Sequence, residues 1–247
     1  MLDTGARRIL AATRFGDVTW LPEVTSTNDE VASRARSGAV PEGIVVVADA
    51  QTAGRGRRGR AWEAPPGSSL LVSVLLRPKA PHLGLVAAGL AAVDACRSVT
   101  GVDASLKWPN DLMVDGKGKL AGILAEAVAD GGVVVGLGLN VDWSTTPLPP
   151  GATSLAEVTG MAEVTGTGFD RAPLLVAYLV ALEHRCRQEP DEIMSTYRAA
   201  CSTIGRRVRV ELPGGASHEG VATDVDDTGR LVVADRAIAA GDVVHLR

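Results

Sequence analysis

Residues 105–141 read SLKWPNDLMVDGKGKLAGILAEAVADGGVVVGLGLNV and carry the strongest fold signal in the chain. Apolar runs alternate here with glycine-containing turns. The pattern predicts four short strands, at residues 105–108, 112–114, 120–127 and 133–139. Asp115 and Gly116 form a dipeptide typical of a tight turn between two of these strands. The segment therefore indicates a sheet built from consecutive strands.

Two predicted strands and a buried helix precede this segment. Residues 44–48 are rich in β-branched side chains and residues 70–76 form a second apolar run, so both are typical of buried strands. Residues 83–99 are rich in alanine and leucine, which favours a largely buried helix. Residues 1–24 form a short lead-in, too short for an independent DNA-binding domain.

Polar capping patterns predict the other helices. Thr27 and Glu30 fit a capping box that starts a helix, and Gly38 is its expected stop. Asp170 is the expected cap of a longer helix that follows it. The sequence also favours two more helices, at residues 153–160 and 190–201.

The pattern changes after Ile204. Short apolar runs separated by glycine-containing turns predict strands at residues 206–212, 219–225, 231–234, 237–239 and 243–246. So many short strands in so small a segment favour a small antiparallel barrel. We therefore expect two domains, residues 1–202 and residues 203–247.

The composition is that of an ordinary globular protein. The 247 residues include 25 Lys and Arg against 29 Asp and Glu, and 46% are hydrophobic, which excludes the disordered and collagen-like classes. Apolar runs end well short of a membrane span, and the N-terminus carries no secretion signal. Three widely spaced cysteines favour reduced thiols, so we expect a cytoplasmic protein with no membrane contact.

Residues 51–62, QTAGRGRRGRAW, concentrate positive charge in one loop. Its four arginines stand in a chain of net charge −4, so their removal leaves −8. Glycine permits close backbone approach to a ligand, and guanidinium and backbone N–H groups suit phosphates and carboxylates. The spacing is neither that of a Walker A loop nor that of a dinucleotide fingerprint. A solvated flexible loop and an RNA-binding Arg-Gly segment are the alternatives.

Two lysines and two amides mark a second group of candidate residues. Lys107 and Asn110 lie in the KWPND segment at residues 107–111, and Lys119 begins an otherwise apolar strand. A lysine at the mouth of a buried strand can hold an anionic oxygen where its charge acts most strongly. Asn140 ends another apolar strand with an amide able to read a base or sugar edge, or to serve as a turn residue.

Together these segments resemble the biotin–protein ligases in order and relative spacing. The matching pieces are Ser26-Thr27-Asn28, GRGRRGR at 54–60, KWPND at 107–111, KLAGILAE at 119–126 and GLGLN at 136–140. The resemblance covers residues 20–145 and the small C-terminal domain. It implies an α+β fold: a mixed β-sheet catalytic domain flanked by helices, of the class II synthetase-like type, followed by an SH3-like β-barrel.

The resemblance also implies a two-step reaction. Biotin is activated with ATP to biotinyl-5′-AMP and pyrophosphate, with Mg²⁺, and is then transferred to a lysine of a biotin carboxyl carrier protein domain. Acceptors would be acyl-CoA or pyruvate carboxylases. The short lead-in implies a ligase without DNA binding, and a homodimer is compatible with the resemblance.

Site roles follow by the same resemblance. Lys119 and Arg57 are the expected catalytic residues, and Asp111 is the one expected on Mg²⁺. Residues expected to bind biotin are Ser26, Thr27, Asn28, Gln51, Gly54, Arg55, Gly56, Arg57 and Lys119. Those expected on the nucleotide side are Arg57, Arg58, Trp62, Lys107, Asn110 and Asn140. A lipoate–protein ligase, which is a related acyl-adenylate enzyme, and an Arg-Gly-loop RNA-binding module remain the alternative functions.

Overall fold

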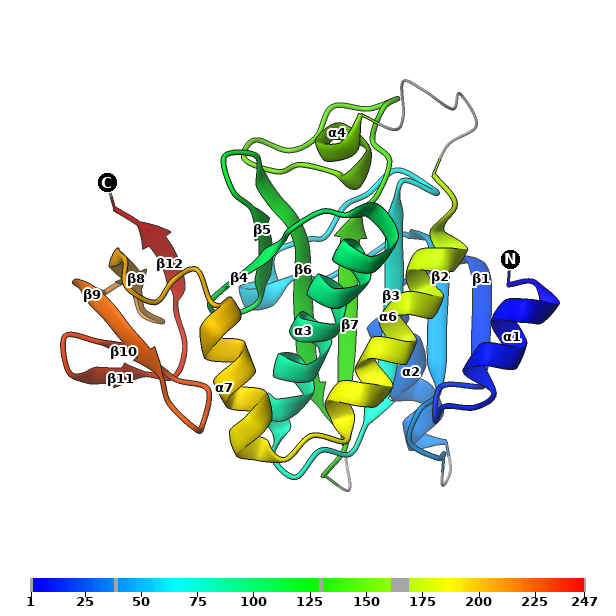
Figure 1. The fold of residues 1–247 in the computed structure, drawn as a ribbon, viewed down its shortest axis with the longest axis horizontal. Coiled ribbons are helices and arrows are strands. Elements are labelled where there is room, and N and C mark those ends of the chain that lie inside the picture. The colour runs from blue at the N-terminus through cyan, green and yellow to red at the C-terminus, as the bar shows by residue number, and fades with distance from the viewer. Residues whose placement is uncertain (1, 38–39, 129–130, 161–168, 247) are drawn as a thin grey trace.

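A seven-stranded sheet forms the centre of the molecule (Figure 1). The structure is a computed structural model and describes residues 2–37, 40–128, 131–160 and 169–246. The strand order is β1-β2-β3-β7-β6-β5-β4. The strands are β1 (Val18–Val24), β2 (Val45–Gln51), β3 (Ser69–Leu76), β4 (Ser105–Lys107), β5 (Asp111–Val114), β6 (Gly118–Ala127) and β7 (Val133–Asn140).

Among the strands that the structure describes, only the first pair is parallel, which makes the sheet mixed. β1 and β2 run parallel because α2 (Thr27–Arg36) connects them as a crossover, and all other neighbours are antiparallel. β4 to β7 follow one another through short turns, which confirms the sheet expected from residues 105–141. The α+β class with a mixed sheet is likewise confirmed.

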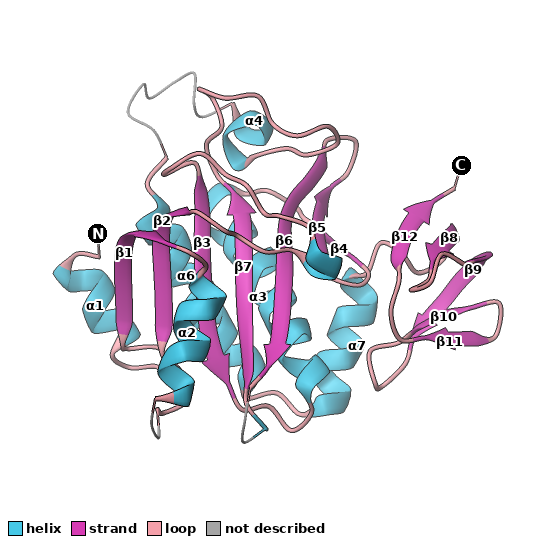
Figure 2. Cartoon of the chain, turned by 180° about the vertical axis from the view of Figure 1, so that it is seen from behind, coloured by secondary structure: helices cyan, strands magenta, loops and turns pink. Residues whose placement is uncertain are grey.

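Helices cover the two faces of the sheet unequally. α3 (Pro81–Thr100), α6 (Arg171–Cys186), α7 (Pro190–Ala200) and α1 (Thr4–Leu10) lie on one face, and α2 lies on the other (Figures 1 and 2). α3 is long and apolar enough to cross a membrane by length and composition alone, but 67% of that window is buried against the sheet and α6. Since burial in a core explains its composition, α3 is the central core helix.

A second, five-stranded sheet follows the main one. β8 (Arg207–Glu211), β9 (Ser217–Val225), β10 (Leu231–Val233), β11 (Arg236–Ile238) and β12 (Asp242–His245) pair antiparallel in the order β11-β10-β9-β8-β12. This confirms the expected strands. The pairings among the described residues leave β11 and β12 as two edges, so closure into a barrel is not seen.

Specific contacts fix the small sheet to the main one. The indole Nε1 of Trp108, just after β4, donates to the carbonyl oxygen of Gly229 at 2.9 Å. Arg198 of α7 donates to the carbonyl oxygen of Val225 at 2.7 Å. Figure 1 shows the small sheet beside β4 and α7, at the end of the molecule opposite α1. The two sheets therefore form one continuous body around the KWPND segment.

Two local predictions were wrong. The supposed lead-in contains α1 and the edge strand β1. α2 is capped by Ser26 without a side-chain hydrogen bond, and Thr27 is its first residue. The capping box does not form because the Thr27 hydroxyl bonds Gln51, while Glu30 pairs with Arg34 at 3.0 Å. The expected stop at Gly38 lies outside the described residues.

The short α4 (Leu155–Thr159) and the cap at Asp170 are confirmed.

Candidate functional site

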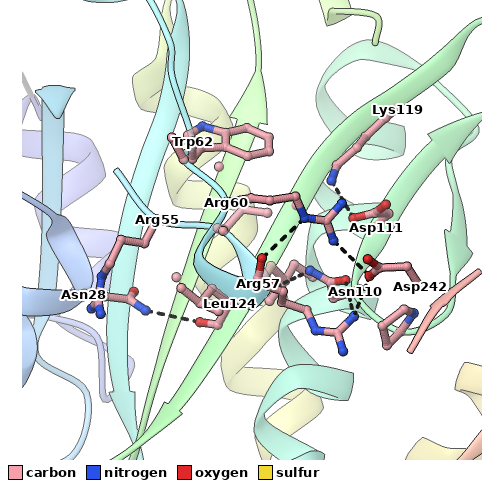
Figure 3. Close-up of a pocket in the computed structure, with 18 of the residues that line it drawn as sticks. Asn28, Arg55, Arg57, Arg60, Trp62, Asn110, Asp111, Lys119, Leu124 and Asp242 are labelled. Atoms are coloured by element: carbon pink, nitrogen blue, oxygen red, sulfur yellow. Dashed lines mark hydrogen bonds and ion pairs between the residues drawn. The ribbon is translucent and has the colours of Figure 1, made fainter. Parts of the chain in front are cut away.

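A cavity of about 380 Å³ lies between the start of α2 and the small sheet, on the side of β6 and β7 against which Asn28 of α2 packs. β6 and β7 form its floor, the Arg-Gly loop forms one wall, and β12 closes the far end. The predicted site residues that line it are Ser26, Thr27, Asn28, Gln51, Arg55, Gly56, Arg57, Trp62, Lys107, Asn110, Asp111 and Lys119. Segments far apart in the sequence therefore meet in one cavity, as Figure 3 shows for its central part.

Buried polar side chains that can form hydrogen bonds line one end of the cavity. Ser26, Thr27 and Asn28 are only 2 to 4% exposed at the start of α2. The backbone nitrogen of Thr27 donates to Gln51 Oε1 at 2.8 Å, and its hydroxyl lies 3.0 Å from the same oxygen. Because the Gln51 oxygen is held this way, its Nε2 remains a donor that a ligand can use. This end is suited to a small polar ring with both donors and acceptors.

The floor of the cavity consists of glycines. Gly136 and Gly138 alternate along β7, and Gly122 is the register partner of Gly138 on β6. A Cβ on Gly138 would lie 2.5 Å from Trp62 Cε2, and one on Gly136 would collide with the Asn28 side-chain oxygen. Glycine is required at both positions because the Trp62 indole and the Asn28 amide pack directly on the backbone.

The other end of the cavity is positively charged. Lys119 Nζ lies 2.6 Å from Asp111 Oδ1 and 5.5 Å from the centre of a Trp62 ring. Lys107 is nearby: burial lowers its pKa, with Asp111 acting in the opposite direction and Lys119 adding to the decrease. Burial likewise lowers the pKa of Arg57, which as a guanidinium stays charged. Lys107, Lys119 and Arg57 thus lie close together in a confined space beside the carboxylates of Asp111 and Asp242, an arrangement that suits an additional anion.

The Arg-Gly loop is held down at both of its ends. At its start, Arg55 donates to Asp29 at 2.6 Å and to Glu126 at 2.9 Å. Further along, one carboxylate of the small sheet, Asp242, pairs with Arg60 at 2.8 Å, with Arg58 at 3.1 Å and with Arg57 at 3.7 Å. The loop therefore lies across the cavity rather than extending into solvent, as the flexible-loop alternative would require.

Backbone geometry explains the glycines of this loop. Residues Arg57–Gly59 form a single 3-10 turn in which Arg58 has φ 56° and Gly59 has φ 72°. A Cβ on Gly54 would collide with the Trp62 carbonyl oxygen, so no residue larger than glycine fits at this position. The backbone nitrogen of Trp62 donates to the Gly54 carbonyl oxygen at 2.9 Å, so a hydrogen bond joins the two ends of the loop. The glycines thus permit the turn that brings Trp62 over the floor.

Three predicted site residues do not line the cavity. Gly54 supports the loop from beneath, and Arg58 points to Asp242 at the surface. Asn140 is 4% exposed, and its Nδ2 donates to the Thr153 carbonyl oxygen at 3.0 Å. The interpretation of Asn140 as a base- or sugar-reading amide is therefore not supported by its position. Its turn role, the alternative weighed above, fits this contact.

Several cavity residues were missed. Asp242, Glu211 and Val243 come from the small sheet, where the sequence offered only turn and strand signals. Glu126 stood at the end of the KLAGILAE segment without an assigned role, yet it bonds both Asn28 and Arg55. The alternation GLGL at residues 136–139 was a readable signal for a glycine floor.

Among the residues that the structure describes, no three His, Cys, Asp or Glu side chains gather as a metal site. Burial raises the pKa of Cys96 and of Cys186 to about 12, so these thiols stay protonated at neutral pH.

Known proteins resemble this chain over nearly its whole length. A model of the Biotin/lipoate A/B protein ligase family matches residues 20–142, and one of the Biotin protein ligase C terminal domain matches residues 203–246. A biotin--[acetyl-CoA-carboxylase] ligase of Mycobacterium tuberculosis is 44% identical, over 90% of this chain and 86% of that protein.

Solved structures agree. A biotin protein ligase from Aquifex aeolicus in complex with biotin and ATP superposes with a TM-score of 0.77 at 27% identity, over 94% of this chain and all of that one. A biotin protein ligase from Leishmania major in complex with biotinyl-5-AMP gives a TM-score of 0.64 at 26% identity, over 94% of this chain and 98% of that one.

Proposed function

This chain belongs to the Biotin/lipoate A/B protein ligase family, and from that premise we propose that it is an ATP-dependent biotin–protein ligase. It activates biotin as biotinyl-5′-AMP and transfers the biotinyl group to a lysine of an acceptor protein. The observation that carries the proposal is one cavity that joins a buried hydrogen-bonding end to a cationic end. The relatives named above are biotin ligases, so a lipoate ligase is not favoured.

The hydrogen-bonding end suits the ureido ring of biotin. A urea needs one or more donors to its oxygen and acceptors for its two N–H groups. Ser26, Thr27, Asn28 and Gln51 offer both kinds of group, the first three from buried positions, and the glycine floor leaves room for a flat ring. We assign biotin binding to these residues together with Arg55, Gly56 and the backbone of the loop.

Activation takes place at the cationic end. A biotin carboxylate oxygen forms a bond to the α-phosphorus of ATP, and the bond from that phosphorus to the bridging oxygen breaks, so that pyrophosphate leaves with the electron pair. Lys119 and Arg57 stabilise the negative charge that builds on the phosphoryl oxygens. Lys107, Asn110 and Trp62 lie beside them and are assigned to the nucleotide, with Arg58 acting from the surface.

The loop then protects the intermediate. A mixed anhydride reacts readily with water, and a closed wall prevents that side reaction. Transfer forms a bond from the acceptor lysine nitrogen to the biotinyl carbonyl carbon, breaks the anhydride C–O bond, and releases AMP and a proton. The ion pairs at both ends of the loop are the contacts that hold it over the cavity.

The cavity suits a magnesium ion that is bound together with the ATP phosphates. Asp111 lies in the cavity and pairs with Lys119 at 2.6 Å. Mg²⁺ commonly takes one or two carboxylates and completes its shell with substrate phosphates and water, so Asp111 can supply the protein ligand. When bound, the ion would neutralise phosphate charge. The chain's own residues position the reacting groups.

The wider context follows from the same proposal. The acceptor is a biotin carboxyl carrier protein domain of an acyl-CoA or pyruvate carboxylase, and neither DNA nor a membrane is a partner. The protein acts in the cytoplasm, and a homodimer is compatible with the fold. Residues 1–202 form the catalytic domain, and residues 203–247 form a small domain that contributes Asp242 to the loop.

The test is acceptor labelling. The purified chain is incubated with ATP, Mg²⁺ and biotin in the presence of an apo carrier domain, and mass spectrometry locates the modification. The proposal predicts one biotinylated lysine on the carrier and none when that lysine is replaced by arginine. Lipoate attachment without biotin attachment would support the lipoate ligase. Salt-sensitive RNA binding without acyl transfer would support the RNA-binding module.

A further inference from the structure

Glu126, near the end of β6, touches two of the residues to which biotin binding is assigned. Its Oε2 accepts from Asn28 Nδ2 at 2.7 Å and from Arg55 at 2.9 Å. The side chain is 33% exposed, at the margin of the cavity. One carboxylate thus joins the start of α2 to the start of the Arg-Gly loop.

The hydrogen bonds of Asn28 determine what its amide can offer to a ligand. Its Nδ2 has two protons, which go to Glu126 Oε2 and, at 3.3 Å, to the Leu124 carbonyl oxygen. Its Oδ1 accepts from Ser73 Oγ at 2.6 Å, and a carbonyl oxygen has a second lone pair. Both donors are used within the protein, so Asn28 can present only an acceptor to the cavity.

The Glu126 carboxylate fixes the orientation of the Asn28 side-chain amide. An amide oxygen and nitrogen have nearly the same shape, so the hydrogen-bond partners fix which way the group points. A flipped Asn28 would place its oxygen against the Glu126 carboxylate and the Leu124 carbonyl, where every group is an acceptor. The carboxylate therefore makes the flipped state unfavourable, and Asn28 is buried to 4% exposure, where an unmatched polar group is costly.

We propose that Glu126 is a positioning residue that orients the Asn28 amide, so that its oxygen accepts an N–H group of the ligand, and that tethers Arg55 above it. The inference rests on the proposed function. A ureido ring carries the N–H donor that this arrangement needs, whereas a dithiolane ring has none. Glu126 thereby favours biotin over lipoate without touching either.

Asp29 provides a matched control. It pairs with the same Arg55 nitrogen at 2.6 Å, but the contacts of the Asn28 amide do not include it. Asp29→Asn therefore weakens the loop tether alone, whereas Glu126→Ala removes both the tether and the orienting carboxylate. Glu126→Gln keeps an oxygen that can accept from Asn28 and removes the charge.

The test is biotin-dependent exchange of labelled pyrophosphate into ATP, with KM measured separately for biotin and for ATP. Loss of a partly buried, charge-assisted hydrogen bond predicts that Glu126→Ala raises the biotin KM about 5- to 30-fold, with the ATP KM changed less than about twofold. Asp29→Asn should change the biotin KM less than about twofold, since an exposed ion pair contributes little. Glu126→Gln should raise the biotin KM by less than Glu126→Ala does, because its side-chain oxygen can still accept from Asn28 Nδ2 and the Leu124 carbonyl oxygen still disfavours the flipped amide.

A double-variant cycle separates positioning from general damage. If Glu126 acts through Asn28, the Glu126→Ala change should have little further effect on the biotin KM in an Asn28→Ala background. Thermal unfolding of each variant reports whether it folds. Additive effects, equal increases in both KM values, or an Asp29→Asn effect as large as that of Glu126→Ala would overturn the inference. Absence of biotin-dependent exchange by the unaltered chain would instead overturn the proposed function, and this inference with it.

Discussion

Asp242 gives the sharpest prediction about the Arg-Gly loop, because one carboxylate of the small sheet holds three of its arginines. Asp242→Asn keeps the side-chain shape and removes the charge. The three pairs lie at 2.8, 3.1 and 3.7 Å, and the Asp242 side chain is 26% exposed. Partly exposed pairs contribute about 0.2–1 kcal/mol each, or about 0.6–3 kcal/mol for three. Because the 3.7 Å pair contributes least, we take the middle of this range, so their loss should favour the open loop by about 1–2 kcal/mol, or about 5- to 30-fold.

Limited trypsin digestion measures this opening. Trypsin cuts after arginine, and cleavage of a folded protein tracks the population of the locally open state. Peptides cut between residues 55 and 60 should form about 5- to 30-fold faster in Asp242→Asn than in the unaltered chain. Asp227→Asn is the control, because Asp227 lies in the turn between β9 and β10 of the same small sheet, pairs with Arg198 of α7 and does not contact the loop. Equal cleavage rates in all three proteins would refute the reasoning.

Three further predictions concern catalysis, the cavity floor and pH. Lys119→Ala removes a charged contact to the reacting phosphate and should slow adenylate formation by about 30- to 1,000-fold, a loss of about 2–4 kcal/mol; an unchanged single-turnover rate would exclude this role. Gly138→Ala places a methyl group 2.5 Å from the Trp62 ring, so the indole must move. Overpacking of this kind should raise KM for ATP or biotin about tenfold in steady-state assays, and unaltered kinetics would contradict the packing. Burial, and then Lys107 and Arg206, lower the pKa of His245 to about 4. As the pH falls, His245 is therefore protonated in the unfolded chain before it is protonated in the folded one. The free energy of unfolding should decrease as the pH is lowered from about 6.5 to about 4, by at most about 3.5 kcal/mol. The free energy of unfolding is measured by urea titration at several pH values across that range. In His245→Asn it should depend less steeply on pH than in the unaltered chain, and an unchanged pH dependence would contradict this prediction.

Much of the main sheet was predictable because its strands carry local signals. β3 is apolar except for Ser69 and Ser73 and is buried along its whole length, so its composition alone identified it. β1 was missed because its sequence, VTWLPEV, contains Pro22 and a charged residue. Such a strand is tolerated at an edge, and β1 is the edge of the sheet. Its strand character comes from pairing with β2, which no local pattern reports.

The candidate site divides in the same way. The Arg-Gly loop and Lys119 were identified because charge in an apolar or glycine-rich setting is locally unusual. Asp242 was not, since it stands more than 180 residues from the arginines that it holds and reads as an ordinary turn residue. Asn140 shares a strand face with Gly138, but the loop that carries Thr153 covers it and takes its donor. Contacts between distant segments decide both cases.

The central claim is that this cavity joins biotin to the α-phosphate of ATP. The most direct measurement is exchange of labelled pyrophosphate into ATP by the purified chain, with biotin, with lipoate and with neither. The account predicts exchange that depends on biotin and is strongly reduced by Lys119→Ala. Exchange with lipoate but not with biotin, or no exchange with either acid, would contradict it.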